Sequence, residues 1–472
     1  MRDYSFCNFL HELRLLRGLT QYQLGALVGV SDKAVSKWEN GFSKPKSSIL
    51  FKLSEVLEIS VDELLTCKYN SLEKRDNKGV FAMKKQLWKR AYDKISQLYR
   101  DNTPIEITNR FLTEQAEMQD TDMIVYFDML SALARDARRQ GEYICVRGGA
   151  GASFVAYLLG ATDVNPLKPH YYCPECHAVI FDDSAKDGWD LQGRSCSCGK
   201  AMLTDGHNIP FETYRHVVHR NTSFNISVSP EYLSLATNFI LDYFKDHKIT
   251  KEEFEPNKII GFEVISEKSK CSVTLCVNEE FLRYRELERQ TATSFERIPF
   301  ISEEISEEFR KCNTDGITDF KSDFMKNMLR LISPISYCEL IQISGFAHGT
   351  SVWLNNGNKL IENGHSIANL VAYRDDVFNY IQKKITDNGS ADTGFAYKVM
   401  EDTRRGIYCN NGMPDSVKNG LRSIGAEDWF IESICKIAYL FPKAHGVTYT
   451  RMALTLMWYK IHYPTEFNKI ML

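Results

Sequence analysis

Four cysteines in the middle of the chain have the spacing of a metal site. A Cys-x-x-Cys pair is followed some twenty residues later by a Cys-x-Cys pair: Cys173, Cys176, Cys196 and Cys198. Two such pairs can turn their thiolates toward one point and complete a tetrahedron around zinc. Gly199 can relax the tighter second turn, and His177 is a spare ligand. We expect a structural Zn²⁺, because four protein ligands leave no open position for chemistry.

A glycine-rich stretch just upstream has the composition of an anion site. A β-like run, Tyr143 to Val146, enters the loop 147–151, and Ser153 then opens an apolar helix. Small residues let backbone amides approach an anion at a helix N-terminus. Alone the signal is weak, because such turns often serve packing. No Gly-Lys-Ser/Thr follows, so the stretch is not a P-loop.

The polar run "VHRNTSFNISVSP", residues 218–230, contains no carboxylate, and the first acid after it is Glu231. Its Ser, Asn and Thr side chains can donate and accept hydrogen bonds but carry no charge. Hard divalent cations such as Mg²⁺ prefer anionic oxygens. The run therefore does not supply a magnesium site.

The elements that position these residues follow a helical N-terminal segment. Residues 5–66 carry five short helical patterns, in which Thr20, Ser31 and Ser60 are expected N-caps. The first pattern places Phe6, Phe9, Leu10, Leu13 and Leu16 on one face. Two short helices around a turn at Gly29 have helix-turn-helix spacing. A small helical bundle that only docks to another protein is the alternative.

Composition limits the function classes. The 472 residues suggest two to four domains, and a net charge of −3 means that any nucleic-acid patch is local. The stretch from Lys68 to Arg100 contains ten basic residues and three acidic ones. This composition suits either contact with DNA phosphates or a solvated linker helix. Thirteen cysteines without a signal peptide, and no apolar run of membrane-spanning length, indicate a cytoplasmic protein without a membrane segment.

The N-terminal segment resembles the Cro/C1 type of helix-turn-helix. The resemblance is carried by two stretches, "LRLLRGLTQYQLGALVGVSDKAVSKWENG" and "LFKLSEVLEISVDELL". The resemblance implies a recognition helix from Ser31 to Trp38 in the major groove, and a homodimer on two half-sites of operator DNA. Asp32 departs in charge, since it would repel phosphate, although a carboxylate can accept from a cytosine amine. The implied DNA-contacting residues are Gln21, Ser31, Asp32, Lys33, Ser36, Lys37 and Lys44.

Most of the remaining chain resembles PolC, the Gram-positive type of DNA polymerase III alpha subunit. The words that carry the resemblance are "VRGGAGASFVAYLLGATDVNPLKPHYYCPECH", "CELIQISGFAHGTSVWLNNGNKLIENG", "RDDVFNYI", "KVMEDTRRG" and "YLFPKAHGVTYTRMALTLMWYKIHYP". The implied fold is a multidomain α+β chain. It has an all-α head at 1–67, a basic helical linker at 68–103, a reduced palm at 104–285 with a zinc ribbon at 171–202, and mainly helical fingers at 286–472.

In that family the glycine-rich loop and the fingers hold the triphosphate of the incoming nucleotide. Arginine, lysine and helix amides suit a polyphosphate, whose charge needs fixed donors. Two of the family's loop serines are here Gly149 and Ala152. The implied phosphate-binding residues are Arg147, Gly148, Gly151, Ser153, His348, Arg374, Arg404, Arg405, Lys443 and His445.

The family's palm also carries three aspartates that hold two Mg²⁺ ions. The resemblance places these positions at Ser223, Asn225 and Thr274, all of which are neutral. Mg²⁺ and catalysis are therefore not expected, although Glu279 or Glu280 could substitute. The family's exonuclease and clamp-binding regions are also not expected in this chain.

Three functions remain open. The first is a DNA-binding regulator or decoy whose inactive polymerase-like module binds a deoxynucleoside triphosphate or a polymerase inhibitor that imitates one. The second is a diverged DNA polymerase with relocated metal ligands. The third is an interaction protein that competes for a replisome component.

Overall fold

The computed structural model describes residues 6–17, 19–57, 59, 64, 78–100, 103–119, 121–214, 222–254, 258–266, 269–334, 336–389 and 393–472. The chain forms two compact units, Met1–Lys94 and Ile95–Leu472, which we describe separately. Helix α6 (Lys78–Tyr99) contains the division, which lies within the predicted linker. No helix in these described ranges is long and apolar enough to cross a membrane.

The N-terminal unit is helical, as predicted. Thr20 and Ser31 are N-caps whose side chains accept hydrogen bonds from the Gln23 and Ala34 amides, which confirms both expected caps. Leu10, from the predicted apolar face, is fully buried. Ser60 and most of the fifth helical pattern lie outside the described residues. The helices before α6 are α1 (Phe6–Leu16), α2 (Gln21–Val28), α3 (Asp32–Glu39) and α4 (Ser47–Leu57).

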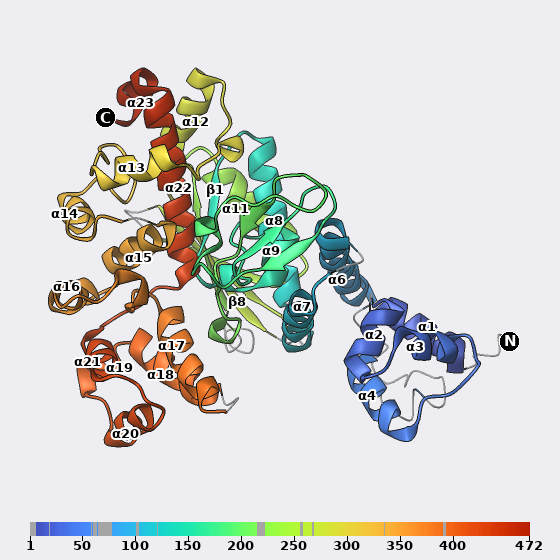
Figure 1. The fold of residues 1–472 in the computed structure, drawn as a ribbon. Coiled ribbons are helices and arrows are strands. Elements are labelled where there is room, and N and C mark those ends of the chain that lie inside the picture. The colour runs from blue at the N-terminus through green and yellow to red at the C-terminus, as the bar shows by residue number, and fades with distance from the viewer. Residues whose placement is uncertain are drawn as a thin grey trace. The chain divides into compact units, whose positions relative to one another are not determined.

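A mixed sheet is the centre of the second unit (Figure 1). The described strands follow the order β1-β5-β8-β7-β6, in which β5 and β8 run parallel and the other neighbours antiparallel. The sequence alternates β-branched residues around Val273 to Val277, a pattern that predicts a strand, and this stretch is part of β8. The strands are β1 (Ile144–Arg147), β5 (Thr222–Val228), β6 (Lys248–Phe254), β7 (Ile259–Ile265) and β8 (Lys270–Val277).

Side-chain alternation gives this sheet one buried face. In β5, Phe224 and Ile226 are buried whereas Ser223 and Asn225 are exposed, as the two-residue period of a strand requires. The buried face packs on α8 and α11, where Phe127 meets Phe224 edge-on. The opposite face carries Ser223 and Asn225. The helices in this part of the sequence are α7 (Ile105–Met118), α8 (Met123–Arg139), α9 (Phe154–Leu159) and α11 (Leu233–Tyr243).

The segment between α9 and β5 forms a second, three-stranded antiparallel sheet in the order β3-β2-β4. Its strands are only three residues long, so a small apolar cluster and the cysteine site must hold them together. Short helical turns precede and follow β2 and β3. These elements are η3 (Gly149–Ala152), β2 (His170–Tyr172), β3 (Val179–Phe181), η4 (Gly188–Asp190) and β4 (Leu203–Asp205).

The C-terminal region is helical, and its long helix α22 packs against β1 and η3 as well as against α15 and α17 (Figure 1). The predicted boundary at 285/286 falls inside α12, which is continuous. The elements are α12 (Glu280–Thr291), η5 (Phe295–Arg297), α13 (Glu303–Arg310), α14 (Asp323–Ile332), α15 (Tyr337–His348), η6 (Trp353–Gly357), α16 (Asn358–Glu362), η7 (Ile367–Asn369), α17 (Arg374–Asp387), α18 (Gly394–Arg404), α19 (Ile407–Asn411), α20 (Asp415–Ser423), α21 (Asp428–Lys436), α22 (Lys443–His462) and α23 (Pro464–Met471).

Candidate functional site

Three strands place a row of polar side chains on the face of the large sheet that lies opposite α8 and α11. Arg147 of β1 pairs with Asn225 of β5, and Asn225 pairs with Thr274 of β8. Directly paired residues project to the same face of a sheet. Ser223 lies on this face as well, because it precedes Asn225 by two residues. The three positions that the resemblance assigns to metal-binding aspartates therefore lie together, beside a guanidinium group.

The acids near these positions are Glu263, Glu279 and Glu280. Glu263 lies on the same face, because it pairs with Ser272, the strand partner of Ser223. Its Oε1 lies 2.5 Å from Lys270 Nζ. Glu280 accepts hydrogen bonds from Lys321 Nζ at 2.9 Å and from Thr318 Oγ1 at 2.8 Å, so its carboxylate is already engaged. Glu279 is exposed just before α12. Within these ranges, only the four cysteines form a group of three or more His, Cys, Asp or Glu that could hold a metal. The row offers neutral oxygens, which suit Mg²⁺ poorly.

The glycine-rich loop after β1 passes close to side chains from distant parts of the chain. Gly148 has a φ of 90°, a conformation that favours glycine. A Cβ on Gly149 would lie 3.0 Å from the Tyr214 ring and 3.4 Å from Arg374 Nη2. A Cβ on Gly151 would lie 2.4 Å from the Cβ of Ala444. Close packing against α22 thus explains Gly151 without a ligand.

Ser153 differs from the expectation that it contacts phosphate. Its hydroxyl donates to the fully buried Glu114 at 2.7 Å, and the amides of Phe154 and Val155 donate to the same carboxylate. Arg110 Nε completes the arrangement at 2.5 Å from Glu114. The carboxylate of Glu114 therefore occupies the N-terminus of α9, where a phosphate would otherwise be favoured.

Arg374 is the described cation with the most unused hydrogen-bonding capacity next to this loop. Its side chain is 8% exposed and its Nε lies 3.9 Å from Asp375. Neither Nε nor Nη2 has a hydrogen-bond partner within the described ranges. The Asp375 carboxylate instead accepts from the Thr213 hydroxyl at 2.8 Å and from the Lys443 amide at 2.7 Å. Buried donors without acceptors are costly, so this guanidinium is suited to an anionic ligand.

Arg404 and Arg405 lie at the end of α18 and differ in their partners. Arg404 Nη2 is 2.6 Å from Glu401, whereas Arg405 is exposed. Burial raises the pKa of Glu401, but Arg404 and, more weakly, Arg374 outweigh burial and lower it overall. Arg404 is thus already paired.

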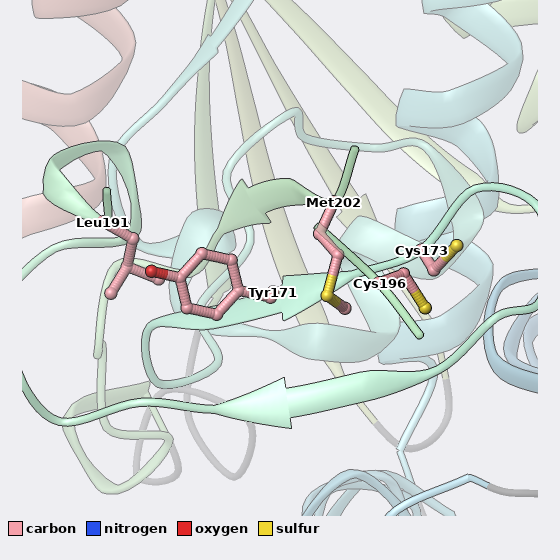
Figure 2. Close-up of a cluster of buried hydrophobic side chains, with 5 residues drawn as sticks. All are labelled: Tyr171, Cys173, Leu191, Cys196 and Met202. Atoms are coloured by element: carbon pink, nitrogen blue, oxygen red, sulfur yellow. The ribbon is translucent and has the colours of Figure 1, made fainter. Parts of the chain in front are cut away.

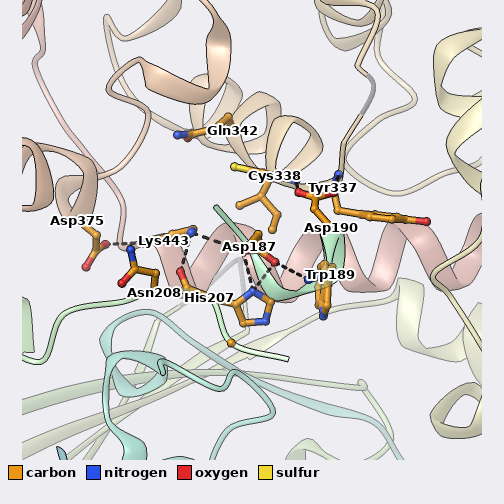
Figure 3. Close-up of polar contacts among 12 residues, drawn as sticks. Asp187, Trp189, Asp190, His207, Asn208, Tyr337, Cys338, Gln342, Asp375 and Lys443 are labelled. Carbon is orange, nitrogen blue, oxygen red and sulfur yellow. Dashed lines mark hydrogen bonds and ion pairs between the residues drawn. The ribbon is translucent and has the colours of Figure 1, made fainter. Parts of the chain in front are cut away.

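Lys443 is buried in an ion network rather than open to solvent (Figure 3). Its Nζ lies 3.5 Å from Asp187 Oδ2 and donates to the His207 carbonyl at 2.6 Å. Burial acts to lower the pKa of Lys443, but nearby carboxylates, Asp187 foremost, outweigh it and raise the pKa. The charge predicted to bind phosphate is therefore already balanced in this structure.

His348 and His445 are packed together between α15 and α22. Their ring centroids are 5.0 Å apart, and each ring also packs on Tyr449. Burial, His348 and Arg147 lower the pKa of His445 to about 3, so its imidazole is neutral near pH 7. His445 can donate or accept a hydrogen bond to a ligand but adds no positive charge.

Asp319 is a candidate that only the structure reveals. Its Oδ2 is buried without a hydrogen-bond partner among the described residues, 4.0 Å from His348 Nε2. Burial and then the charge of Glu280 raise its pKa to about 7. Perturbed acids of this kind are typical of functional sites. Its loop, "TDGITDF", has no motif that would have identified it.

The four cysteines form one cluster in the small sheet. All four Sγ atoms lie within 4.8 Å of one another. The closest pairs, Cys173–Cys198 and Cys176–Cys196, are 3.5 and 3.4 Å apart. Tetrahedral Zn–S bonds of about 2.3 Å place sulphurs roughly 3.8 Å apart, so the cluster could hold a metal such as zinc. Figure 2 shows the adjoining apolar side chains, Tyr171, Leu191 and Met202.

His177 does not join this cluster as a spare ligand. Its backbone has a φ of 62°, and Nδ1 hydrogen-bonds the Leu98 carbonyl at 2.9 Å. The sequence placed it next to Cys176, but the turn directs its ring elsewhere.

The predicted recognition helix corresponds to α3. Asp32, Lys33 and Lys37 are exposed on it, Ser36 is partly exposed, and Lys44 is exposed beyond it. Gln21 differs, because its Nε2 donates to the buried Glu39 at 2.8 Å. Glu39 also binds Arg14, with Nε–Oε1 at 2.5 Å. This buried pair fixes α1 against α3 and leaves the lysine-bearing face of α3 accessible.

Three protein-family models match segments of this chain. A helix-turn-helix family model matches residues 10–64. The model for the bacterial DNA polymerase III alpha NTPase domain matches residues 85–222, and that for the alpha subunit finger domain matches residues 276–393.

Curated relatives extend this similarity. DNA polymerase III PolC-type from Thermotoga petrophila is 28% identical over 80% of this chain, and that from Staphylococcus saprophyticus is 26% identical over 79%. The chain is similar to PolC-type DNA polymerase III over most of its length and carries a helix-turn-helix head. It spans about a third of the length of these relatives, 34% and 32% respectively.

The neutral residues lie between two family matches in the PolC-like unit, residues 95–472. The NTPase-domain match ends at Thr222, and the finger-domain match begins at Cys276. Ser223, Asn225 and Thr274 all lie between these two matches. The glycine-rich loop, the four cysteines and Arg374 lie inside them.

Proposed function

We propose that this protein is a DNA-binding regulator or decoy whose PolC-like unit binds a nucleotide without turning it over. The head would contact operator DNA as a homodimer through α3. The ligand would be a deoxynucleoside triphosphate or an inhibitor that imitates one at a polymerase active site. The four cysteines would hold Zn²⁺ in a structural role.

The observation that carries this proposal is the charge of the site. Polymerases of this class use carboxylates to hold Mg²⁺, which stabilises the leaving pyrophosphate. Here the row Ser223, Asn225 and Thr274 is neutral and lies next to Arg147, while Arg374 has unused donors beside Gly149. A polyanion can bind such a site through the arginines, whereas neutral side chains at these three positions suit two magnesium ions poorly.

The direct test is calorimetric titration of the full, zinc-loaded chain with the four deoxynucleoside triphosphates, with and without EDTA. We expect binding that persists in EDTA, and a loss of about tenfold to hundredfold in affinity for Arg374→Ala, because hydrogen bonds to charged groups are lost. Arg422→Ala is the matched control, since Arg422 is exposed and pairs with Asp428 at the surface. Arg374→Lys, checked by thermal unfolding, separates lost binding from lost folding.

The alternative is a diverged polymerase, and primer extension distinguishes it. Magnesium-dependent extension that is lost in Glu279→Gln or Glu280→Gln would establish relocated ligands and overturn the proposal. We expect no extension of any primer.

The third function, competition for a replisome component, predicts a different result. Neither nucleotides nor polymerase inhibitors would then bind the purified chain, and Arg374→Ala would change nothing in the titration.

A further inference from the structure

The stretch Lys186–Asp190, which we call the latch segment, lies between the two cysteine pairs and contacts the helices of the C-terminal region. Asp190 Oδ1 and Oδ2 accept hydrogen bonds from the amides of Tyr337 at 2.6 Å and Cys338 at 2.9 Å. These are the first two residues of α15. A carboxylate at a helix N-terminus satisfies free donors and opposes the helix dipole.

A second contact of the latch segment is made at the start of α22. Asp187 is fully buried and lies 3.5 Å from Lys443 Nζ and 2.9 Å from His207 Nδ1. Lys443 is the first residue of α22. Breaking a buried pair of this kind leaves an uncompensated charge, which is strongly destabilising. Asp187 therefore fixes the N-terminus of a second helix (Figure 3).

Two further contacts complete the set. Lys186 Nζ donates to the Ala368 carbonyl in η7 at 2.7 Å. The Trp189 ring packs edge-on against His207 and Phe300, with centroids 4.7 and 5.1 Å away. Four of the five consecutive residues thus bind segments that are far away in the sequence.

Gly188, the remaining residue, shows how closely this segment is seated. A Cβ at this position would lie 2.1 Å from the Asp205 carbonyl oxygen of β4. The Gly188 amide also donates to the Gly206 carbonyl at 2.7 Å. The backbone of the latch segment is therefore tied to the small sheet on one side while its side chains bind the helices on the other.

The four-cysteine site closes the loop that contains this segment. Cys176 precedes it and Cys196 follows it, and their Sγ atoms lie 3.4 Å apart. A metal bound there would restrict the chain between these residues and lower the conformational entropy that is lost when the latch segment docks. The donor set fits such a metal, because it consists of four convergent thiols.

We propose that the latch segment couples the metal site to the fingers: the bound metal holds Lys186–Asp190 in place, and this segment in turn positions the N-termini of α15 and α22. Asp190 and Asp187 are positioning residues in this arrangement. The proposal does not depend on nucleotide binding, and its test uses no nucleotide.

Cys338 reports on the latch segment directly. Its side chain is buried at the start of α15 and its amide donates to Asp190. Cys271 is buried in β8, on the face that packs on α11, and serves as the internal reference. Pulsed alkylation of the full chain with N-ethylmaleimide, followed by peptide mass spectrometry, measures both thiols in one experiment.

We expect zinc removal by a chelator under reducing conditions to speed alkylation of Cys338 by at least about tenfold, because hydrogen bonds to a charged acceptor are lost. Cys271 should be unchanged. Zinc-loaded Asp190→Asn should show the same increase with its metal content intact, and chelation should add little to it. Asp183→Asn is the matched control, because Asp183 is an exposed acid of the same insert.

Three results would overturn the proposal. Cys338 could stay protected after measured loss of zinc, Cys271 could respond as strongly as Cys338, or the freshly purified chain could contain no metal. The first result removes the coupling, the second indicates general unfolding, and the third removes the metal from the arrangement.

Discussion

At the scale of single residues, the site is defined by which charges are balanced. Lys443 and Arg404 are paired with Asp187 and Glu401. Arg374 has a buried guanidinium whose Nε and Nη2 have no hydrogen-bond partner among the described residues. Asp319 is the converse case, an acid without a hydrogen-bond partner in the described structure. Desolvation disfavours the charged form of a buried acid, so we expect Asp319 to respond to pH. Arg374 instead offers donors to an anionic ligand.

Asp319 gives a prediction on pH. Its folded-state pKa is raised to about 7, so the folded state binds its proton more tightly than the unfolded state, where the pKa is about 3.9. The contribution of Asp319 to the free energy of unfolding is therefore fully present below pH 4 and is lost as the pH rises to about 7. Asp319→Asn should gain about 1–3 kcal/mol in free energy of unfolding, relative to the native chain, between pH 4 and pH 8.

Chemical denaturation at several pH values measures this difference. Asp183→Asn serves as its exposed control and should stay parallel to the native chain. A constant offset for Asp319→Asn at all pH values would contradict the raised pKa.

At the scale of elements, the glycine-rich loop is shaped by its neighbours as much as by a ligand. Glu114 of α7 binds the N-terminus of α9, and Ala444 of α22 requires a glycine at position 151. The loop is thereby held between α7 and α22, next to the buried guanidinium of Arg374. A helix N-terminus that already holds a carboxylate is a weak phosphate site.

Gly151 gives the prediction at this scale. Gly151→Ala places a Cβ 2.4 Å from that of Ala444, and overpacking of this kind costs typically about 1–3 kcal/mol. Gly193→Ala is the matched control, because a Cβ at position 193 would meet no atom within 4 Å and the φ there is not left-handed. Thermal unfolding should show a lower midpoint for the first variant only. Equal midpoints would mean that α22 can move away from the loop.

At the scale of the whole molecule, the chain consists of two compact units divided within α6. The metal site and the row of polar residues both belong to the second unit. Units with separate cores can unfold separately. The head and the PolC-like unit should therefore respond differently to the loss of metal.

Calorimetry tests this expectation. Zinc removal should lower the unfolding midpoint of the PolC-like unit by ~5 °C or more, because metal binding contributes to folding free energy. The transition of the head should stay where it is, and restoring zinc should reverse the change. A shift of both transitions would show that the metal stabilises the head as well.

Several features of fold and site were predictable because they depend on local sequence. The caps at Thr20 and Ser31 are short-range hydrogen bonds, and the alternation in β5 and β8 follows from the period of a strand. The convergence of four cysteines follows from two tight turns. Ser223, Asn225 and Thr274 were assigned by resemblance, and the strand register then placed them together.

The sequence by itself determined which chemical groups are present: four thiols for a metal, lysines on a recognition helix, and neutral side chains at Ser223, Asn225 and Thr274. Only the tertiary structure decided which of them are available. Glu114 engages Ser153, Asp187 neutralises Lys443, and burial raises the pKa of Asp319. Each of these effects depends on groups that are distant in the chain and close in space, because desolvation and pairing act over a few ångströms and no local pattern records them.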